Sequence, residues 1–265
     1  MRIDVDGTAV NVATGGRPFS PQRPVIMFIH GAGMEHSAWM QPARWFANHG
    51  WSVAAPDLPG HGRSAGAPLA SVEHMSDWVV RLLDALDAPR AVLVGHSMGG
   101  AIALEAAARH KARVAGLGLI GTAAAIPVGA ALLAAARERP AQAFDMMTTW
   151  SHTPSARLGG SRTPGLWMTG STRRQFDLTP PHVLAVDLAA CAAWATGPDA
   201  ARGVSCPSVV ISAAADLMTP AKHGAALAAL IPGARSVLIP RCGHMILTEA
   251  PDPCLDALIA AFGAG

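Results

Sequence analysis

Six short, continuous apolar runs recur along the chain and limit its possible folds more than any other feature. They lie at Val25–Ile29, Ser52–Ala55, Ala91–Val94, Gly116–Ile120, Ser208–Ser212 and Ser236–Ile239. Helical patterns separate most of them, as at Val72–Leu86, Ser97–Arg109 and Ala221–Leu230. Strands without polar alternation are typical of a parallel sheet with both faces covered by helices. The sequence therefore predicts an α/β fold with a mostly parallel central sheet flanked by helices.

Two segments depart from this alternation. Residues 3–13 alternate apolar and polar positions with period two, which predicts an antiparallel hairpin at the edge of the sheet. Residues 122–203 are rich in Ala, Pro, Thr and Gly, and contain no convincing strand. Their helical patterns lie at Val128–Glu138, Ala141–Trp150 and Pro181–Ala193. An insertion of this length predicts a helical lid late in the sheet, on a core formed by residues 1–121 and 204–265.

Composition and charge exclude several function classes. The 265 residues are 51% hydrophobic and carry a net charge of +2, with scattered positive residues, so neither a nucleic-acid nor a membrane partner is expected. An uncharged stretch, residues 114–136, is long enough to span a bilayer, but Pro127 and its glycines favour a strand followed by a turn and a helix.

The cysteines and the N-terminus bear on the compartment. Cys191, Cys206, Cys242 and Cys254 show no metal-site spacing, so no metal is expected. The N-terminal residues lack the apolar stretch of a signal peptide. Together these features predict a reduced, cytoplasmic protein, and they leave open whether it forms a homo-oligomer.

The stretch "GHSMG" at residues 95–99 follows one apolar run and opens a helix rich in small residues. A serine nucleophile raised above a sheet needs a tight strand-to-helix turn, which strains the serine and excludes side chains on either side. Gly95 and Gly99, two residues before and two residues after Ser97, occupy those positions. This context predicts that Ser97 is a nucleophile; the alternative is a serine that only caps the helix.

A nucleophilic serine needs a base and an acid that orients the base. Asp216 and His244 each follow an apolar run, in loops. The predicted triad is therefore Ser97, Asp216 and His244, with a loop-exposed aspartate and a surface histidine as the alternatives. The oxyanion needs two N–H donors, and we expect these from Met98 and Ala32, with Gly33 as second choice for the latter.

Five stretches carry a resemblance in combination and in order. They are "HGAG" at 30–33, "DLPGHGRS" at 57–64, "GHSMGG" at 95–100, "AAADLMTP" at 213–220 and "CGHMILTEAP" at 242–251. With these, nearly the whole chain resembles the α/β-hydrolase superfamily, in the branch of carboxylesterases, enol-lactonases and cofactor-free haloperoxidases. The resemblance implies a Ser–His–Asp hydrolase without a cofactor. It also implies structural roles for Asp57 and His61. We expect a structural role for His30 as well, and we expect His96 to be non-catalytic because the sharp turn points neighbouring side chains apart.

The expected substrate is a small to medium, moderately hydrophobic ester or lactone. Met146, Met147, Trp150 and Trp167 are predicted to line its pocket, unless they pack within the lid. Arg173 and Arg174 are candidates for binding a carboxylate of the substrate. The alternative is that both side chains are simply exposed to solvent. Alternative functions are perhydrolysis, carbon–carbon bond hydrolysis or a non-catalytic ligand receptor. His96 counts against carbon–carbon hydrolysis, because such relatives usually have Asn before the serine.

Overall fold

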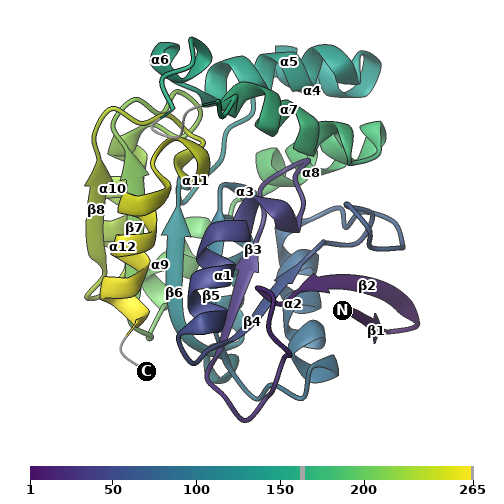
Figure 1. The fold of residues 1–265 in the computed structure, drawn as a ribbon, viewed down its shortest axis with the longest axis vertical. Helices are drawn as coiled ribbons and strands as arrows, with labels where there is room; N and C mark the ends of the chain where they lie inside the picture. Colours follow the sequence, from purple (N-terminus) through teal and green to yellow (C-terminus); the bar gives the residue numbers. More distant parts are fainter. Residues whose placement is uncertain (162–164, 264–265) are drawn as a thin grey trace.

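The computed structural model describes residues 1–161 and 165–263, which form one eight-stranded sheet (Figure 1). Its strands, in sequence order, are β1 (Arg2–Val5), β2 (Thr8–Ala13), β3 (Val25–Ile29), β4 (Ser52–Pro56), β5 (Ala91–His96), β6 (Val114–Ile120), β7 (Ser208–Ala213) and β8 (Arg235–Ile239). The order across the sheet is β1-β2-β4-β3-β5-β6-β7-β8. The six predicted strands agree with β3 to β8 to within two residues at each end.

Most of the sheet is parallel, as predicted. β3 to β8 pair in parallel, whereas β1 pairs with β2, and β2 with β4, in antiparallel register. Every residue of β3, β4, β5 and β7 is buried, which explains their unbroken apolar sequences. The α/β fold and the N-terminal hairpin are therefore confirmed.

Helices cover both faces of the sheet. One apolar cluster packs α2 (Val72–Ala85), α3 (Met98–Arg109) and α10 (Ala221–Leu230) on one face. A second packs α1 (Met40–Asn48) and α12 (Pro251–Phe262) on the other. Because β3 to β8 run parallel, their carboxyl ends lie along one edge of the sheet, where loops from different strands meet.

The segment between β6 and β7 carries a layer of helices beyond that edge (Figure 1). The layer consists of α4 (Ala130–Glu138), α5 (Pro140–Ser151), α6 (Pro154–Arg157), α7 (Met168–Asp177) and α8 (Pro181–Ala193). The next helix, α9 (Gly197–Gly203), packs against α3 of the core. The helices beyond the edge are thus α4 to α8, and α9 belongs with the core helices by its contacts.

In the part of the chain that the structure describes, no helix has the length and apolar character needed to cross a membrane. The uncharged stretch at 114–136 divides between β6 and the first turns of α4.

Candidate active site

Ser97 lies between the end of β5 and the start of α3, as the cap residue of that helix. Its backbone has φ 54° and ψ −119°, a conformation that residues other than glycine rarely adopt. Its N–H donates to Ile120 O on the neighbouring strand at 2.9 Å, which holds the turn against β6. The serine is therefore kept in a strained turn by the packing around it.

Gly95 and Gly99 make this turn possible. A Cβ on Gly95 would lie 2.0 Å from the backbone oxygen of Gly99, and a Cβ on Gly99 would lie 2.1 Å from the backbone oxygen of Ile29. Both clashes are with backbone, which cannot move aside cheaply. The spacing of glycine, serine and glycine thus follows from close approach of strand β5, helix α3 and strand β3.

His244 and Asp216 form a buried pair next to the serine. His244 Nδ1 lies 2.8 Å from Asp216 Oδ2, and Ser97 and His244 line the same small cavity. Thr219 Oγ1 lies 2.8 Å from both Asp216 Oδ2 and Gly121 O, and 3.2 Å from His244 Nδ1. The other carboxylate oxygen accepts the N–H groups of Met218 and Thr219, each at 2.8 Å. Asp216 is therefore fixed in place by its own loop.

These contacts set the charge of Asp216. Burial alone would raise the pKa of its carboxyl, but the charge of His244 and the hydrogen bonds from His244 and Thr219 outweigh burial and lower it. The carboxylate therefore stays ionised at neutral pH. It faces the Nδ1 side of the imidazole, which leaves Nε2 as the nitrogen able to take a proton from the serine side.

His96 also contacts His244. Its Nε2 donates to His244 O at 3.0 Å, and the two ring centroids are 4.8 Å apart. Burial, together with the nearby His244, lowers the pKa of His96 to about 3, so the ring is neutral. His96 Nδ1 has no hydrogen-bond partner in the described residues and lies against Gly31, where a Cβ would be 3.2 Å away. These contacts hold the His96 ring beside His244 and away from solvent.

Ala32 and Met98 place unused N–H groups at this site. Among the described residues neither N–H has a protein acceptor, and Ala32 lines the cavity beside Ser97. The second choice, Gly33, differs because its N–H donates to Asp187 Oδ2 at 2.8 Å. Of the two candidates in this loop, Ala32 is therefore the one whose donor is available.

The cavity beside Ser97 is small and rich in methionine. Its open volume of about 20 Å³ has room for roughly one water. The large side chains around it are Met34, Met147, Phe176, Met218 and Met245. Of the four lid residues predicted to line a pocket, Met147 is the one found here within the described chain. Met146 packs against the core, and Trp150 and Trp167 point to solvent with 40% and 69% exposure.

A larger cleft of about 890 Å³ lies elsewhere, and no residue of the Ser–His–Asp group lines it. It runs between the helical layer and the core, with Thr153, Gln175, Leu178, Leu247 and Glu249 among its walls. Glu249 accepts hydrogen bonds from the N–H and hydroxyl of Thr153 at 3.1 and 2.7 Å, which ties the layer to α11 (Ile246–Glu249), the short helix after His244. This cleft and the cavity beside Ser97 share no lining residue among those described and are thus separate spaces.

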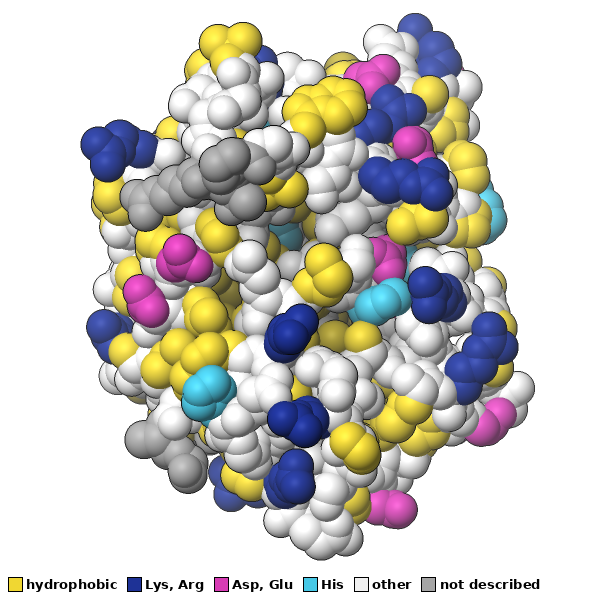
Figure 2. All heavy atoms as spheres, in the orientation of Figure 1, with side chains coloured by type: hydrophobic (Ala, Val, Ile, Leu, Met, Phe, Trp, Pro, Cys, Tyr) yellow, Lys and Arg dark blue, Asp and Glu magenta, His cyan; other side chains and the backbone are white. Residues whose placement is uncertain are grey.

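The two arginines proposed for a substrate carboxylate have different surroundings. Arg173 pairs with Asp145 and Asp177 and lies over the Phe144 ring. Arg174 is exposed and lines the larger cleft. Neither lines the cavity at Ser97. On the face shown in Figure 2, Lys and Arg side chains are scattered among apolar ones.

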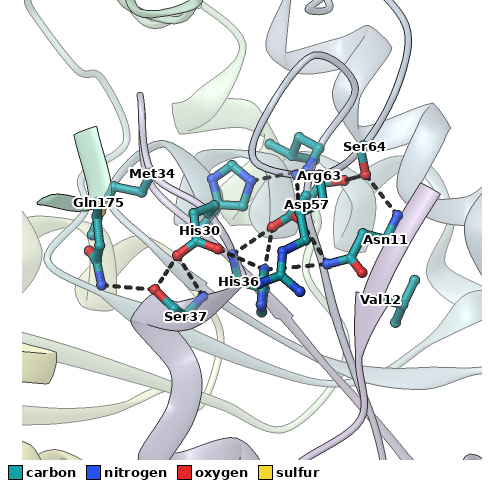
Figure 3. A network of polar contacts seen from close by, with 12 residues as sticks. Asn11, Val12, His30, Met34, His36, Ser37, Asp57, Arg63, Ser64 and Gln175 are labelled. Carbon is teal, nitrogen blue, oxygen red and sulfur yellow. Dashed lines mark hydrogen bonds and ion pairs between the residues drawn. The ribbon is translucent and has the colours of Figure 1, made fainter. Parts of the chain in front are cut away.

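A polar network holds the loop that leads away from Ala32 (Figure 3). His36 Nδ1 lies 2.7 Å from Asp57 Oδ1 and 2.7 Å from Glu35 Oε2, while Asn11 Nδ2 donates to Asp57 Oδ2 at 2.9 Å. Hydrogen bonds to Asp57 and Glu35 raise the pKa of His36 to about 9. In residues 1–161 and 165–263 this is the one group spaced to hold a metal ion, but its charge balance fits a protonated His36 between two carboxylates. The expectation that Asp57 is structural agrees with this network.

Comparison with known proteins decides the family. A family model described as the α/β hydrolase fold matches residues 24–251. The chain belongs to the α/β-hydrolase family. This α/β hydrolase is similar in structure to the enol-lactonase from Burkholderia xenovorans, with a TM-score of 0.89, 26% sequence identity and coverage of 99% of this chain and 100% of that one.

Two curated relatives add to this likeness. The pimeloyl-[acyl-carrier protein] methyl ester esterase of Aromatoleum aromaticum is 29% identical over 246 residues, which is 88% of this α/β hydrolase and 95% of that esterase. A non-heme haloperoxidase of Mycobacterium phage D29 is 40% identical over 120 residues, or 45% of this chain. The match spans only 41% of the phage protein's length.

Sequence reasoning missed two residues of the site. Thr219 follows Asp216 by three positions, the spacing of a local turn hydrogen bond, which was the available signal. Asp187 is the one acidic residue in helix α8, on an otherwise largely apolar surface. A lone acid in such a helix is a sign of a buried partner.

Proposed function

We propose that this α/β hydrolase is a serine hydrolase that cleaves carboxylic esters or lactones through an acyl-enzyme on Ser97. One observation carries the proposal. The strained Ser97 lines the same cavity as His244, whose Nδ1 lies 2.8 Å from the buried Asp216 carboxylate. The similarity to an enol-lactonase and to a methyl ester esterase supports the same class of reaction.

In the first half-reaction His244 Nε2 takes the proton from Ser97 Oγ while that oxygen attacks the substrate carbonyl. Asp216 holds the imidazole in orientation and stabilises the imidazolium that forms. The N–H groups of Ala32 and Met98 receive the oxyanion, and the start of helix α3 adds its positive end. Collapse of the tetrahedral intermediate passes the proton from His244 to the leaving alkoxide and leaves an ester on Ser97.

In the second half-reaction water enters the same position. His244 removes its proton, the hydroxide attacks the acyl carbonyl, and the acid leaves as Ser97 Oγ recovers a proton. The neutral His96 adds no positive charge beside the imidazolium, so the charge that Asp216 must balance stays at one.

We propose that the inserted segment, residues 122–203, is the lid and that its helices α4 to α8 cover the site, whereas α9 at its end packs on the core. The space at Ser97 has room for about one water, so a substrate must displace lid and loop side chains. Four methionines are among the large side chains of this wall, and their unbranched side chains adapt to different shapes. This supports small to medium, moderately hydrophobic substrates.

The test is hydrolysis of p-nitrophenyl acetate and butyrate by the purified protein and by Ser97→Ala. We expect hydrolysis by the unchanged protein and a loss of at least about 1,000-fold in the variant, since loss of a triad serine removes the covalent route. Equal rates for the two proteins would overturn the proposal. An inactive protein that binds these esters with unchanged affinity in both forms would favour the receptor alternative.

A second candidate function is perhydrolysis, in which the same residues transfer the acyl group to peroxide in place of water. It rests on the 40% identity to a haloperoxidase over 45% of the chain. Peracid formed from acetate and hydrogen peroxide, measured beside ester hydrolysis, distinguishes the two. A rate of peracid formation above the rate of ester hydrolysis would favour perhydrolysis. Release of an acid by cleavage of a carbon–carbon bond would favour the remaining alternative, carbon–carbon bond hydrolysis.

A further inference from the structure

Asp187, on lid helix α8, is completely buried and makes its contacts with the core. Its Oδ2 accepts the N–H of Gly33 at 2.8 Å and faces His61 Nε2 at 2.8 Å. These partners are 154 and 126 residues away along the chain. Its other oxygen, Oδ1, has no partner in the described residues. One carboxylate therefore joins the lid to the loop that carries Ala32.

The pair with His61 is a charged one. His61 Nδ1 lies 3.0 Å from Pro59 O, so both ring nitrogens face acceptors and both carry protons. Burial alone would lower the pKa of His61, but the charge and hydrogen bond of Asp187 outweigh it and raise that pKa. A buried ion pair adds little net stability because desolvation offsets the attraction. Its main effect is to fix where the carboxylate points.

Gly33 lies against Leu184 and Asp187 of helix α8 and against Phe176 of α7. Its backbone has φ +67°, and an added Cβ would lie 3.1 Å from Leu184 and 3.4 Å from Phe176. Leu184 lies one turn before Asp187 on the same helix. Helix α8 thus packs on Gly33 with one side chain and accepts its N–H with the other.

This contact selects the oxyanion donor. The loop offers three consecutive N–H groups after Gly31. Met34 N–H donates to Gly31 O at 3.2 Å, and Gly33 N–H donates to Asp187. The N–H of Ala32 is left without an acceptor in the described residues, at the wall of the Ser97 cavity.

We propose that Asp187 is a positioning residue: by accepting the Gly33 N–H it turns the loop so that Ala32 N–H faces the oxyanion, and it does so only when helix α8 is seated. The inference rests on the proposed serine-hydrolase function. It makes the oxyanion site a joint product of the core and the lid. Loss of the carboxylate leaves Gly33 N–H without its acceptor. The loop can then turn the N–H of Ala32, the N–H of Gly33 or neither toward the oxyanion.

The test compares substitutions that keep or remove the acceptor. Asp187→Asn retains a side-chain oxygen for Gly33, whereas Asp187→Leu removes it. The double variant Asp187→Leu/His61→Leu removes both charges and keeps the position apolar, so the protein folds even if the single variant leaves His61 poorly accommodated. Asp177→Leu, which removes an exposed carboxylate paired with Arg173 on helix α7, is the matched control.

The readouts are kcat and KM for p-nitrophenyl butyrate and the inhibition constant of a boronic acid that forms a tetrahedral adduct. Loss of a whole oxyanion donor costs about 100- to 1,000-fold in kcat. For a donor that is only misplaced, we expect about 10- to 100-fold in both Leu variants. We also expect an equal weakening of the boronic acid and a KM within about threefold. Asp187→Asn and Asp177→Leu should stay within about threefold of the unchanged protein.

A kcat within threefold in the folded double variant would overturn the proposal. So would a rise in KM that matches the fall in kcat/KM, since that pattern belongs to a general loss of substrate binding. If the unchanged protein hydrolyses no ester, the proposed function itself fails, which is a different result from a protein that is active with or without Asp187.

Discussion

Replacing Ser97 by glycine should stabilise the protein while removing its nucleophile. Ser97 has φ 54°, where a side chain costs on the order of 1–3 kcal/mol in backbone strain. Alanine at this position keeps that strain, and glycine relieves it. Glycine also makes the unfolded chain more flexible, which offsets about 0.5–1 kcal/mol of the gain. The net expectation is that Ser97→Gly is more stable than Ser97→Ala by about 1 kcal/mol.

Thermal and urea unfolding of the two variants measure this difference. For a chain of this size, 1 kcal/mol corresponds to a rise in Tm of about 2–4 °C. Both variants lack the hydroxyl, so the comparison does not depend on activity. A glycine variant equal to or less stable than the alanine variant would refute the idea that the turn holds Ser97 under strain.

Three further predictions concern the acid, a charged loop and the wall of the cavity. Asp216→Asn should lower kcat on the order of 10,000-fold with KM little changed, because the imidazole loses the partner that fixes its tautomer; a loss below tenfold would contradict that role. The pKa of His36 is raised to about 9, so its stabilisation is complete below about pH 6.5 and lost as the pH rises through 9. Urea unfolding at pH 6 and 9.5 should therefore show a larger fall in stability for the unchanged protein than for His36→Gln, and parallel curves would disprove this. Met147→Ala should raise kcat/KM for p-nitrophenyl hexanoate relative to acetate, with Met147→Leu as the control of similar volume; an unchanged ratio would show that Met147 does not limit the cavity.

The sequence predicts most of the fold because the central strands of the sheet are buried on both faces. Every residue of β3, β4, β5 and β7 is buried, and β6 has one half-buried residue, so these strands appear in the sequence as largely apolar runs. The edge strand β8 is mostly exposed and still has apolar residues at its end. The turn at Ser97 could also be predicted, since Gly95 has no room for a Cβ beside the Gly99 oxygen. The strands can be predicted from a regular sequence pattern, and the turn can be predicted from residues that are close together in the sequence.

Residues whose position depends on distant packing could not be predicted. Trp167 and Met147 are both large apolar lid residues, yet one is exposed and the other lines the cavity, because that choice depends on how the lid helices pack. The sequence ranks Ala32 first and Gly33 second as the donor, but it contains no contact that decides between them. Asp187 separates them, and it lies 154 residues from Gly33 along the chain.

The methionine wall of the cavity has a chemical consequence as well as a steric one. Met34, Met147, Met218 and Met245 surround the nucleophile, and a thioether is converted by peroxide to a polar, bulkier sulfoxide. An oxidant that reached Ser97 would therefore alter the walls that shape its substrate. A hydrolytic cycle brings only water and an ester into this space, whereas each peroxide-dependent turnover would expose the site to its own inactivation.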